Sequence, residues 1–191
     1  ICSTFTYVQK IVIYKRTVVK DGAIDLSEVG LSEEEIKEIS QIYIVACGSA
    51  YHVGVAAQYV MEDLARIPVR VELASEFRYR NPILDPKGLV IIISQSGETA
   101  DSLAALRESK KQGVKTLGIV NVIGSSIARE ADNVFYTLAG PEISVATTKA
   151  YSTQLIAAYL LAIQFAKTRE QITEEQYTGY IEDLKTLPEK V

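Results

Sequence analysis

Apolar residues gather in short continuous runs that alternate with longer segments of mixed polarity. The clearest run, Leu-Val-Ile-Ile-Ile at 89–93, is followed by a small polar cluster and then by a helical pattern from Ala100. Such a run is typical of a strand buried on both faces of a parallel sheet. By the same criterion we expect strands near 43–46, 69–73, 89–93, 116–120 and 134–138.

A segment with a helical pattern follows each expected strand, and this alternation predicts an α/β fold. We expect a three-layer α/β/α sandwich around a five-stranded parallel sheet with a flavodoxin-like strand order. Ligands of such folds bind at the carboxyl ends of the strands, where the strand order reverses. Residues 21–191 are expected to form this domain, and residues 1–20 an N-terminal extension or linker remnant in which 11–14 could form an edge strand.

Several helix boundaries have chemical markers. Ser32 followed by Glu35 predicts a capping box, and Lys110, Lys111 and Gly113 are typical of a helix end. The segment 147–165 is apolar nearly all round, so this helix must be covered on more than one side. It is either a core helix or part of the interface of a homodimer.

The composition narrows the classes of function. Apolar residues make up 48% of the chain and charged residues 23%, with a formal net charge of -4. An acidic chain without clustered Lys and Arg is not expected to bind nucleic acid or an anionic membrane. No apolar block reaches the roughly 20 residues of a membrane span, and we expect no secretory signal. Two cysteines fit a reducing compartment, so the expected location is cytoplasmic.

The polar cluster after the run at 89–93 is the strongest candidate site. A helix N-terminus offers backbone N–H groups and a partial positive charge, both of which attract anions. Ser94, Ser96 and Thr99 add hydroxyl donors, and Gly97 lets the backbone approach a ligand closely. This cluster predicts a phosphate site that needs no lysine.

A second polar turn, Cys-Gly-Ser-Ala at 47–50, follows the first expected strand. Ser49 could donate a hydrogen bond to a sugar or phosphate, or it could only cap the helix. In a flavodoxin-like order the first and third strands flank the point where the order reverses, so this turn should lie beside Ser94 to Thr99. Two hydroxyl-rich helix starts at one crevice suggest one phosphorylated ligand.

Other candidate patterns are weaker. Glu72 resembles a ribose-binding acid, but the turn at 47–54 lacks the G-x-G-x-x-G pattern of a dinucleotide site. Arg78 and Arg80 could steer an anion, although a solvated face is the favoured interpretation. The segment 147–149, Thr-Thr-Lys, could form another wall of the site, although helix capping is favoured.

The single histidine, His52, is interpreted as a packed or solvated residue, and Cys47 as a buried structural thiol. One histidine and two distant cysteines cannot supply a closed zinc site, so we expect no metal. No cofactor is expected either. Glu98 is the best carboxylate that the expected site loops offer for acid–base chemistry.

Several linked motifs carry a resemblance that covers about Asp21 to the end of the chain. They are Ser94 to Thr99 with Ala-Asp at 100–101, Ala-Ser-Glu-Phe-Arg-Tyr-Arg at 74–80, Gly-Pro-Glu at 140–142 and Val-Ala-Thr-Thr-Lys-Ala at 145–150. Together they resemble the first sugar isomerase (SIS) domain of the glutamine:fructose-6-phosphate aminotransferases.

The resemblance implies a role for individual residues. Ser94, Gln95, Ser96 and Thr99 would hold the phosphate of fructose 6-phosphate or glucosamine 6-phosphate, and Ser49 would contact the sugar. The backbone near Val145 would line the sugar side of the site. The family usually has Thr-Ser where this chain has Ser49 and Ala50, so one sugar contact is expected to be lost.

The resemblance also implies what this chain lacks. In the family a glutaminase domain releases ammonia, and two SIS domains use it to convert fructose 6-phosphate to glucosamine 6-phosphate. The lysine that forms the imine, the glutamate base and the ring-opening histidine belong to the second SIS domain and the tail. We therefore expect this chain to bind sugar phosphate without catalysing; the alternative is a regulatory SIS protein that senses sugar phosphates.

Overall fold

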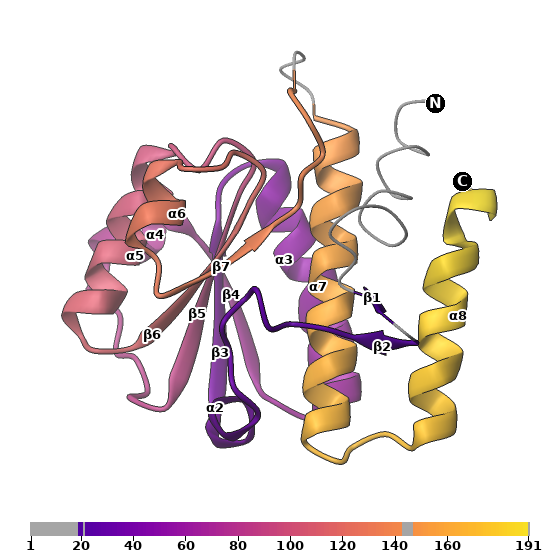
Figure 1. Ribbon diagram of the computed structural model, residues 1–191. Helices are drawn as coiled ribbons and strands as arrows, with labels where there is room; N and C mark the ends of the chain where they lie inside the picture. The colour runs from indigo at the N-terminus through magenta and orange to yellow at the C-terminus, as the bar shows by residue number, and fades with distance from the viewer. Residues whose placement is uncertain (1–18, 21, 143–146, 191) are drawn as a thin grey trace.

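Five parallel strands form the central sheet, in the order β4-β3-β5-β6-β7 (Figure 1). The computed structural model describes residues 19–20, 22–142 and 147–190. Since β3 lies between β4 and β5, the strand order reverses beside β3, and the expected parallel, flavodoxin-like sheet is confirmed. The strands of this sheet are β3 Gln41–Ala46, β4 Val69–Leu73, β5 Gly88–Ser94, β6 Lys115–Val120 and β7 Asn133–Tyr136.

Helices cover both faces of the sheet and give the three expected layers (Figure 1). One face carries α4 Ala74–Tyr79, α5 Ala100–Lys111 and α6 Ser126–Glu130. The other carries α3 Ser49–Val60, which continues as the π-helical turn η1 Met61–Ala65, together with α7 Lys149–Thr168. Two further helices, α2 Glu33–Glu38 and α8 Glu174–Lys190, pack against α7.

The inner strands β3, β5 and β6 are buried on both faces, as their continuous apolar runs indicated, whereas the edge strands β4 and β7 are partly exposed. In β5, Ile91 and Ile93 belong to the core beneath α3 and α7, whereas Val90 and Ile92 belong to the core beneath α4, α5 and α6. All four side chains are at most 1% exposed. The site loop after β5 is therefore anchored at the end of a strand that is packed from both sides.

The apolar helix α7 is covered mainly by this chain itself. It packs against α3, η1, α2 and α8, and 13 of its residues are buried.

Neither α8 nor the short antiparallel hairpin of β1 Val19–Lys20 and β2 Ala23–Ile24 belongs to the expected elements. The Tyr177 hydroxyl of α8 accepts a hydrogen bond from the backbone N–H of Ile24 at 2.7 Å, which joins the hairpin to the helix.

Some expected boundaries need correction. The last strand ends at Tyr136 rather than 138, because Leu138 has a left-handed backbone with φ of 48°. The long helix spans Lys149–Thr168 rather than 147–165. The hairpin β1–β2 has residues on both sides of position 21, which leaves the expected division at that position untested, and the candidate strand at 11–14 lies outside the described residues.

Other boundaries agree with the structure. Ser32 and Glu35 form the predicted capping box at the start of α2. After α5, Gly113 adopts a φ of 76° and its N–H donates to the Lys110 carbonyl, which ends the helix. Within the described part of the chain, no helix is long and apolar enough to cross a membrane.

Candidate functional site

The two polar turns lie side by side at the carboxyl edge of the sheet. β3 and β5 are neighbours in parallel register, with Ala46 opposite Ile93, so the chain leaves both strands at the same level. One turn leads into α3 and the other into α5, whose N-cap residue is Thr99. The predicted meeting of two helix N-termini at one crevice is therefore present in the structure.

A pocket of about 230 Å³ lies between these turns. Five of the six residues expected to bind substrate line it, and the sixth, Val145, lies outside the described residues. The five come from both helix starts, and the start of α7 closes the pocket from a third side. The lining residues are Cys47, Ser49, Ala50, Ile93, Ser94, Gln95, Ser96, Thr99, Glu142, Thr147 and Gln154.

Hydrogen bonds within the loop 94–99 fix its shape. The Ser94 hydroxyl accepts the N–H of Gly97 at 3.1 Å and lies 3.1 Å from the Thr99 hydroxyl. The Ser96 hydroxyl accepts the N–H of Glu98 at 3.2 Å. Because Gly97 has a φ of 68°, the loop can turn tightly over the pocket before α5 begins.

Glu98, the best carboxylate that the expected site loops offer, is bonded to another helix. It is exposed, and its carboxylate accepts the backbone N–H of Ser126 at 2.7 Å, on the start of α6. Hydrogen bonds from Ser126 lower the pKa of Glu98 below its ordinary value. An ionised carboxylate held by α6 is poorly placed to accept a proton from a ligand in the pocket.

The carboxylate that does line the pocket is Glu142, which the pattern analysis did not single out as a site residue. Its Oε2 accepts a hydrogen bond from the Thr147 hydroxyl at 2.8 Å, and both residues line the pocket. The Thr148 side chain makes no capping bond at the start of α7, so the favoured capping interpretation of 147–149 is wrong. The only sequence signal for Glu142 is its place in the motif Gly-Pro-Glu.

In the turn at 47–50, Ser49 does not cap the helix that follows. Gly48, with a φ of 59°, occupies the N-cap position without a side-chain bond, so Ser49 is the first residue of α3 and an exposed lining residue of the pocket. Cys47 is half-buried and lines the pocket rather than being fully buried, and the Ser102 hydroxyl donates to its thiol sulfur at 3.9 Å. His52 is exposed, with its ring edge-to-face against Tyr51.

The nearby arginines are paired with carboxylates. Arg78 donates to Asp101 at 2.9 Å, and Arg80 donates to Glu72 at 2.7 Å. Both arginine side chains remain about 40% exposed, in keeping with a solvated face. Glu72 is thus engaged by Arg80 rather than presented to a ribose.

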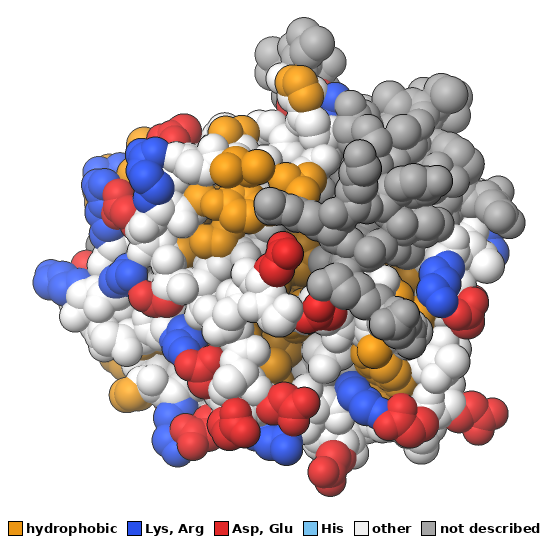
Figure 2. All heavy atoms as spheres, in the orientation of Figure 1, with side chains coloured by type: hydrophobic (Ala, Val, Ile, Leu, Met, Phe, Trp, Pro, Cys, Tyr) orange, Lys and Arg blue, Asp and Glu red, His pale blue; other side chains and the backbone are white. Residues whose placement is uncertain are grey.

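Charges of both signs are interspersed over the described part of the face seen in Figure 2. An anion therefore has to be held by local donors. Among the described residues lining the pocket, Glu142 is the one with a charged side chain, and the donors are hydroxyl, amide and backbone N–H groups. No group of three or more His, Cys, Asp or Glu residues in the described part of the chain is placed to hold a metal ion.

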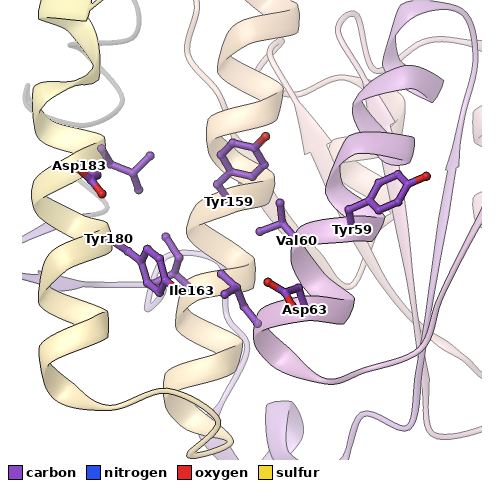
Figure 3. A pocket seen from close by; sticks show the side chains of 9 residues that line it. Tyr59, Val60, Asp63, Tyr159, Ile163, Tyr180 and Asp183 are labelled. Atoms are coloured by element: carbon purple, nitrogen blue, oxygen red, sulfur yellow. The ribbon is translucent and has the colours of Figure 1, made fainter.

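A larger groove lies between α3, α7 and α8 (Figure 3). Its volume is about 670 Å³, and Tyr59, Tyr159 and Tyr180 line it together with Asp63 and Asp183. The two carboxylates of this groove repel a phosphate dianion, whereas the described lining of the smaller pocket has one carboxylate, Glu142, beside the hydroxyl and backbone donors of two helix starts. None of the described residues expected in the site lies there, so the smaller, hydroxyl-lined pocket is the better match for a phosphorylated ligand.

Comparison with known proteins agrees with this geometry. The SIS domain family matches residues 35–164. The glutamine–fructose-6-phosphate aminotransferase of Caldanaerobacter subterraneus is 53% identical over 174 residues, and that of Clostridium tetani is 54% identical over 167 residues. These alignments cover 91% and 87% of this chain but only 29% and 28% of the two relatives.

A solved structure of a related protein has the same fold. The C-terminal domain of glucosamine-fructose-6-phosphate aminotransferase from Francisella tularensis superposes with a TM-score of 0.88 and 40% identity, over 98% of this chain and 51% of that one. The family match extends over more than half of the chain, from α2 into α7. With the fold and the pocket in agreement, this chain belongs to the SIS domain family.

Proposed function

We propose that this chain is the phosphosugar-binding SIS part of a glutamine:fructose-6-phosphate aminotransferase, an enzyme that makes glucosamine 6-phosphate. The observation that carries the proposal is that Ser49, Ser94, Gln95, Ser96 and Thr99 line one pocket at the start of α5. Relatives of that name with 53% and 54% identity support the substrate class.

The phosphate is held by the loop 94–99. A phosphate dianion accepts hydrogen bonds only, and the loop supplies backbone N–H groups, hydroxyl groups and the positive end of the α5 dipole. Since the Ser94 hydroxyl oxygen already accepts the Gly97 N–H, its hydrogen can be given to Thr99 or to a bound phosphate oxygen.

The sugar extends from the phosphate toward the start of α3. Ser49 donates to it from the first turn of that helix, and the backbone near Val145 lines the sugar side. Ala50, 7% exposed in the pocket wall, offers a methyl group where the related enzymes usually offer a hydroxyl.

Binding without catalysis is the expected role of this chain alone. By the family resemblance, the lysine, glutamate base and histidine of the reaction belong to a second SIS domain and the tail, and the chain spans only 28–29% of the relatives' length. We propose that the parent protein also carries a glutaminase domain and that second SIS domain, that it acts as a homodimer, and that it is cytoplasmic. The division into 1–20 and 21–191 remains part of this proposal.

Isothermal titration calorimetry on the 191-residue chain tests the proposal. Fructose 6-phosphate and glucosamine 6-phosphate should give a saturable heat, whereas unphosphorylated fructose, the control, should give none. Absence of heat with both sugar phosphates would contradict the proposal. A coding sequence that continues into a helix-turn-helix domain would favour the sensor, whereas flanking glutaminase and SIS segments favour the enzyme.

A further inference from the structure

Gln154, near the start of α7, is a buried amide that lines the pocket. Its side chain is 1% exposed, yet neither Nε2 nor Oε1 has a hydrogen-bond partner among the residues that the structure describes. Buried side-chain amides in folded proteins are nearly always hydrogen-bonded, because desolvating a donor or acceptor without replacing its partner is costly. An unused amide at a pocket wall therefore requires an explanation.

Among the buried polar groups without a partner in the described part of the chain, Gln154 is the one that lines the pocket, since Ser125, whose hydroxyl is also unpartnered, is not a lining residue. Asn133 and Arg169 each have one unpartnered atom, but each also donates to a backbone carbonyl, that of Val29 in one case and that of Ile36 in the other. The neighbouring Thr153 donates to the Ala150 carbonyl. Gln154 leaves its whole amide unused, at a cost that an apolar side chain in its place would not carry.

The chemistry of the amide indicates what it binds. An amide offers a donor and an acceptor, whereas a phosphate dianion can only accept. Against a phosphate, Gln154 would use only Nε2 and its buried Oε1 would remain unpaired, unlike that of Gln95, whose side chain is only half-buried. A sugar hydroxyl both donates and accepts, so it can satisfy both atoms of the amide.

We propose that Gln154 binds a hydroxyl of the sugar. This inference rests on the proposed function, since it assumes that the pocket takes a sugar phosphate. Gln154 then makes the pocket select a phosphorylated polyol over free phosphate. It is a specificity-determining residue that touches the ligand without taking part in proton transfer.

The test uses Gln154→Leu together with a matched control on the same helix. Gln164 is partnered: its Oε1 accepts the Tyr177 hydroxyl at 2.9 Å, and it is not among the lining residues of the pocket. Gln164→Leu makes the same chemical change where the amide is already used within the protein. Calorimetry with fructose 6-phosphate and with inorganic phosphate gives the two affinities, and thermal unfolding without ligand gives the stability.

The two variants should behave in opposite ways. Gln154→Leu should raise the Kd for fructose 6-phosphate about 10- to 100-fold, leave the affinity for inorganic phosphate nearly unchanged, and not lower the melting temperature. Gln164→Leu should lower the melting temperature and leave both affinities unchanged. If the leucine variant fails to fold, Gln154→Met, which keeps an unbranched side chain, should show the same selective loss.

Unchanged affinity for fructose 6-phosphate in a folded Gln154 variant would overturn the inference and leave the proposed function standing. Equal losses for fructose 6-phosphate and inorganic phosphate would also overturn it, because they would mean that the amide shapes the phosphate loop. If the unaltered protein binds neither sugar phosphate, the proposed function fails and this inference fails with it.

Discussion

Gly97 and Ser125 are packed so closely that a β carbon added to Gly97 would lie 2.6 Å from the β carbon of Ser125 and nearer still to its hydroxyl. Ser125 begins the turn into α6, and the Gly97 carbonyl accepts the N–H of Ile127 at 3.0 Å. The loop 94–99 is therefore held from behind by α6, and its shape depends on glycine at position 97.

Gly97→Ala should lower the free energy of unfolding by about 2–4 kcal/mol, since it adds a steric clash to a strained φ. Gly113→Ala is the matched control: its φ of 76° is similar, but its β carbon would meet nothing within 4 Å. That control should lose only about 1–2 kcal/mol. Urea unfolding measures both, and equal losses would argue against the clash.

Ser96→Ala and Thr99→Ala should each weaken the binding of fructose 6-phosphate by about 1–3 kcal/mol, because each removes a hydroxyl donor to a charged group. Calorimetry measures the effect. Ser109→Ala is a control on α5, since its hydroxyl is bonded to the Ala105 carbonyl and it is not a lining residue. Unchanged affinity in both site variants would place the anion elsewhere.

Tyr177→Phe should destabilise the protein by about 1–3 kcal/mol, because it leaves the N–H of Ile24 and the acceptor of Gln164 without their partner. The pKa of Tyr177 is raised by burial, so the hydroxyl is protonated throughout the neutral range. Tyr180→Phe, on the same helix and in the larger groove, should have a smaller effect. Thermal unfolding distinguishes the two, and equal shifts would contradict the role of this hydroxyl.

Ionisation of Asp132 should make the free energy of unfolding depend on pH in the acid range. Burial raises its pKa, but hydrogen bonds from Lys110 and Thr116 outweigh burial, and the pKa lies below its ordinary value of 3.8. A lowered pKa in the folded state stabilises the protein above the unfolded value, and this contribution is lost as the pH falls through the folded value. The stability difference between the unaltered protein and Asp132→Asn should therefore be constant near neutral pH and shrink below about pH 4. Urea unfolding at a series of pH values measures it, and a difference that stays constant in acid would contradict it.

Much of the fold could be predicted because strands buried on both faces have continuous apolar runs, as 89–93 does. The position of the loop 94–99 followed from the parallel sheet, because the ends of neighbouring parallel strands meet at one edge. The hairpin β1–β2 is too short for a periodic signal. In α8 the buried Tyr177, Ile181 and Leu184 recur at the four- and three-residue spacing of an amphipathic helix, so the sequence carries a signal for this helix, whereas its packing against α7 is a long-range contact that the sequence does not show.

The rest of the pocket could not be predicted because it depends on contacts between distant segments. Gln154 is a single polar residue on an apolar helix, and its sequence context is the same whether it meets solvent or a ligand. Thr147 has the pattern of a cap, but its hydroxyl bonds to Glu142 instead. The sequence does not show that the Glu98 carboxylate is already hydrogen-bonded, because its partner on α6, Ser126, follows 28 residues later.

A binding site built from neutral donors also has a consequence for the response to ionic strength. Mobile ions compete with a lysine or arginine for an anion and screen its charge, whereas hydroxyl and amide groups in a half-enclosed pocket offer those ions much less to screen. The affinity for a sugar phosphate should then change little as salt is added. The fraction of protein with bound ligand would then be similar at low and at high ionic strength.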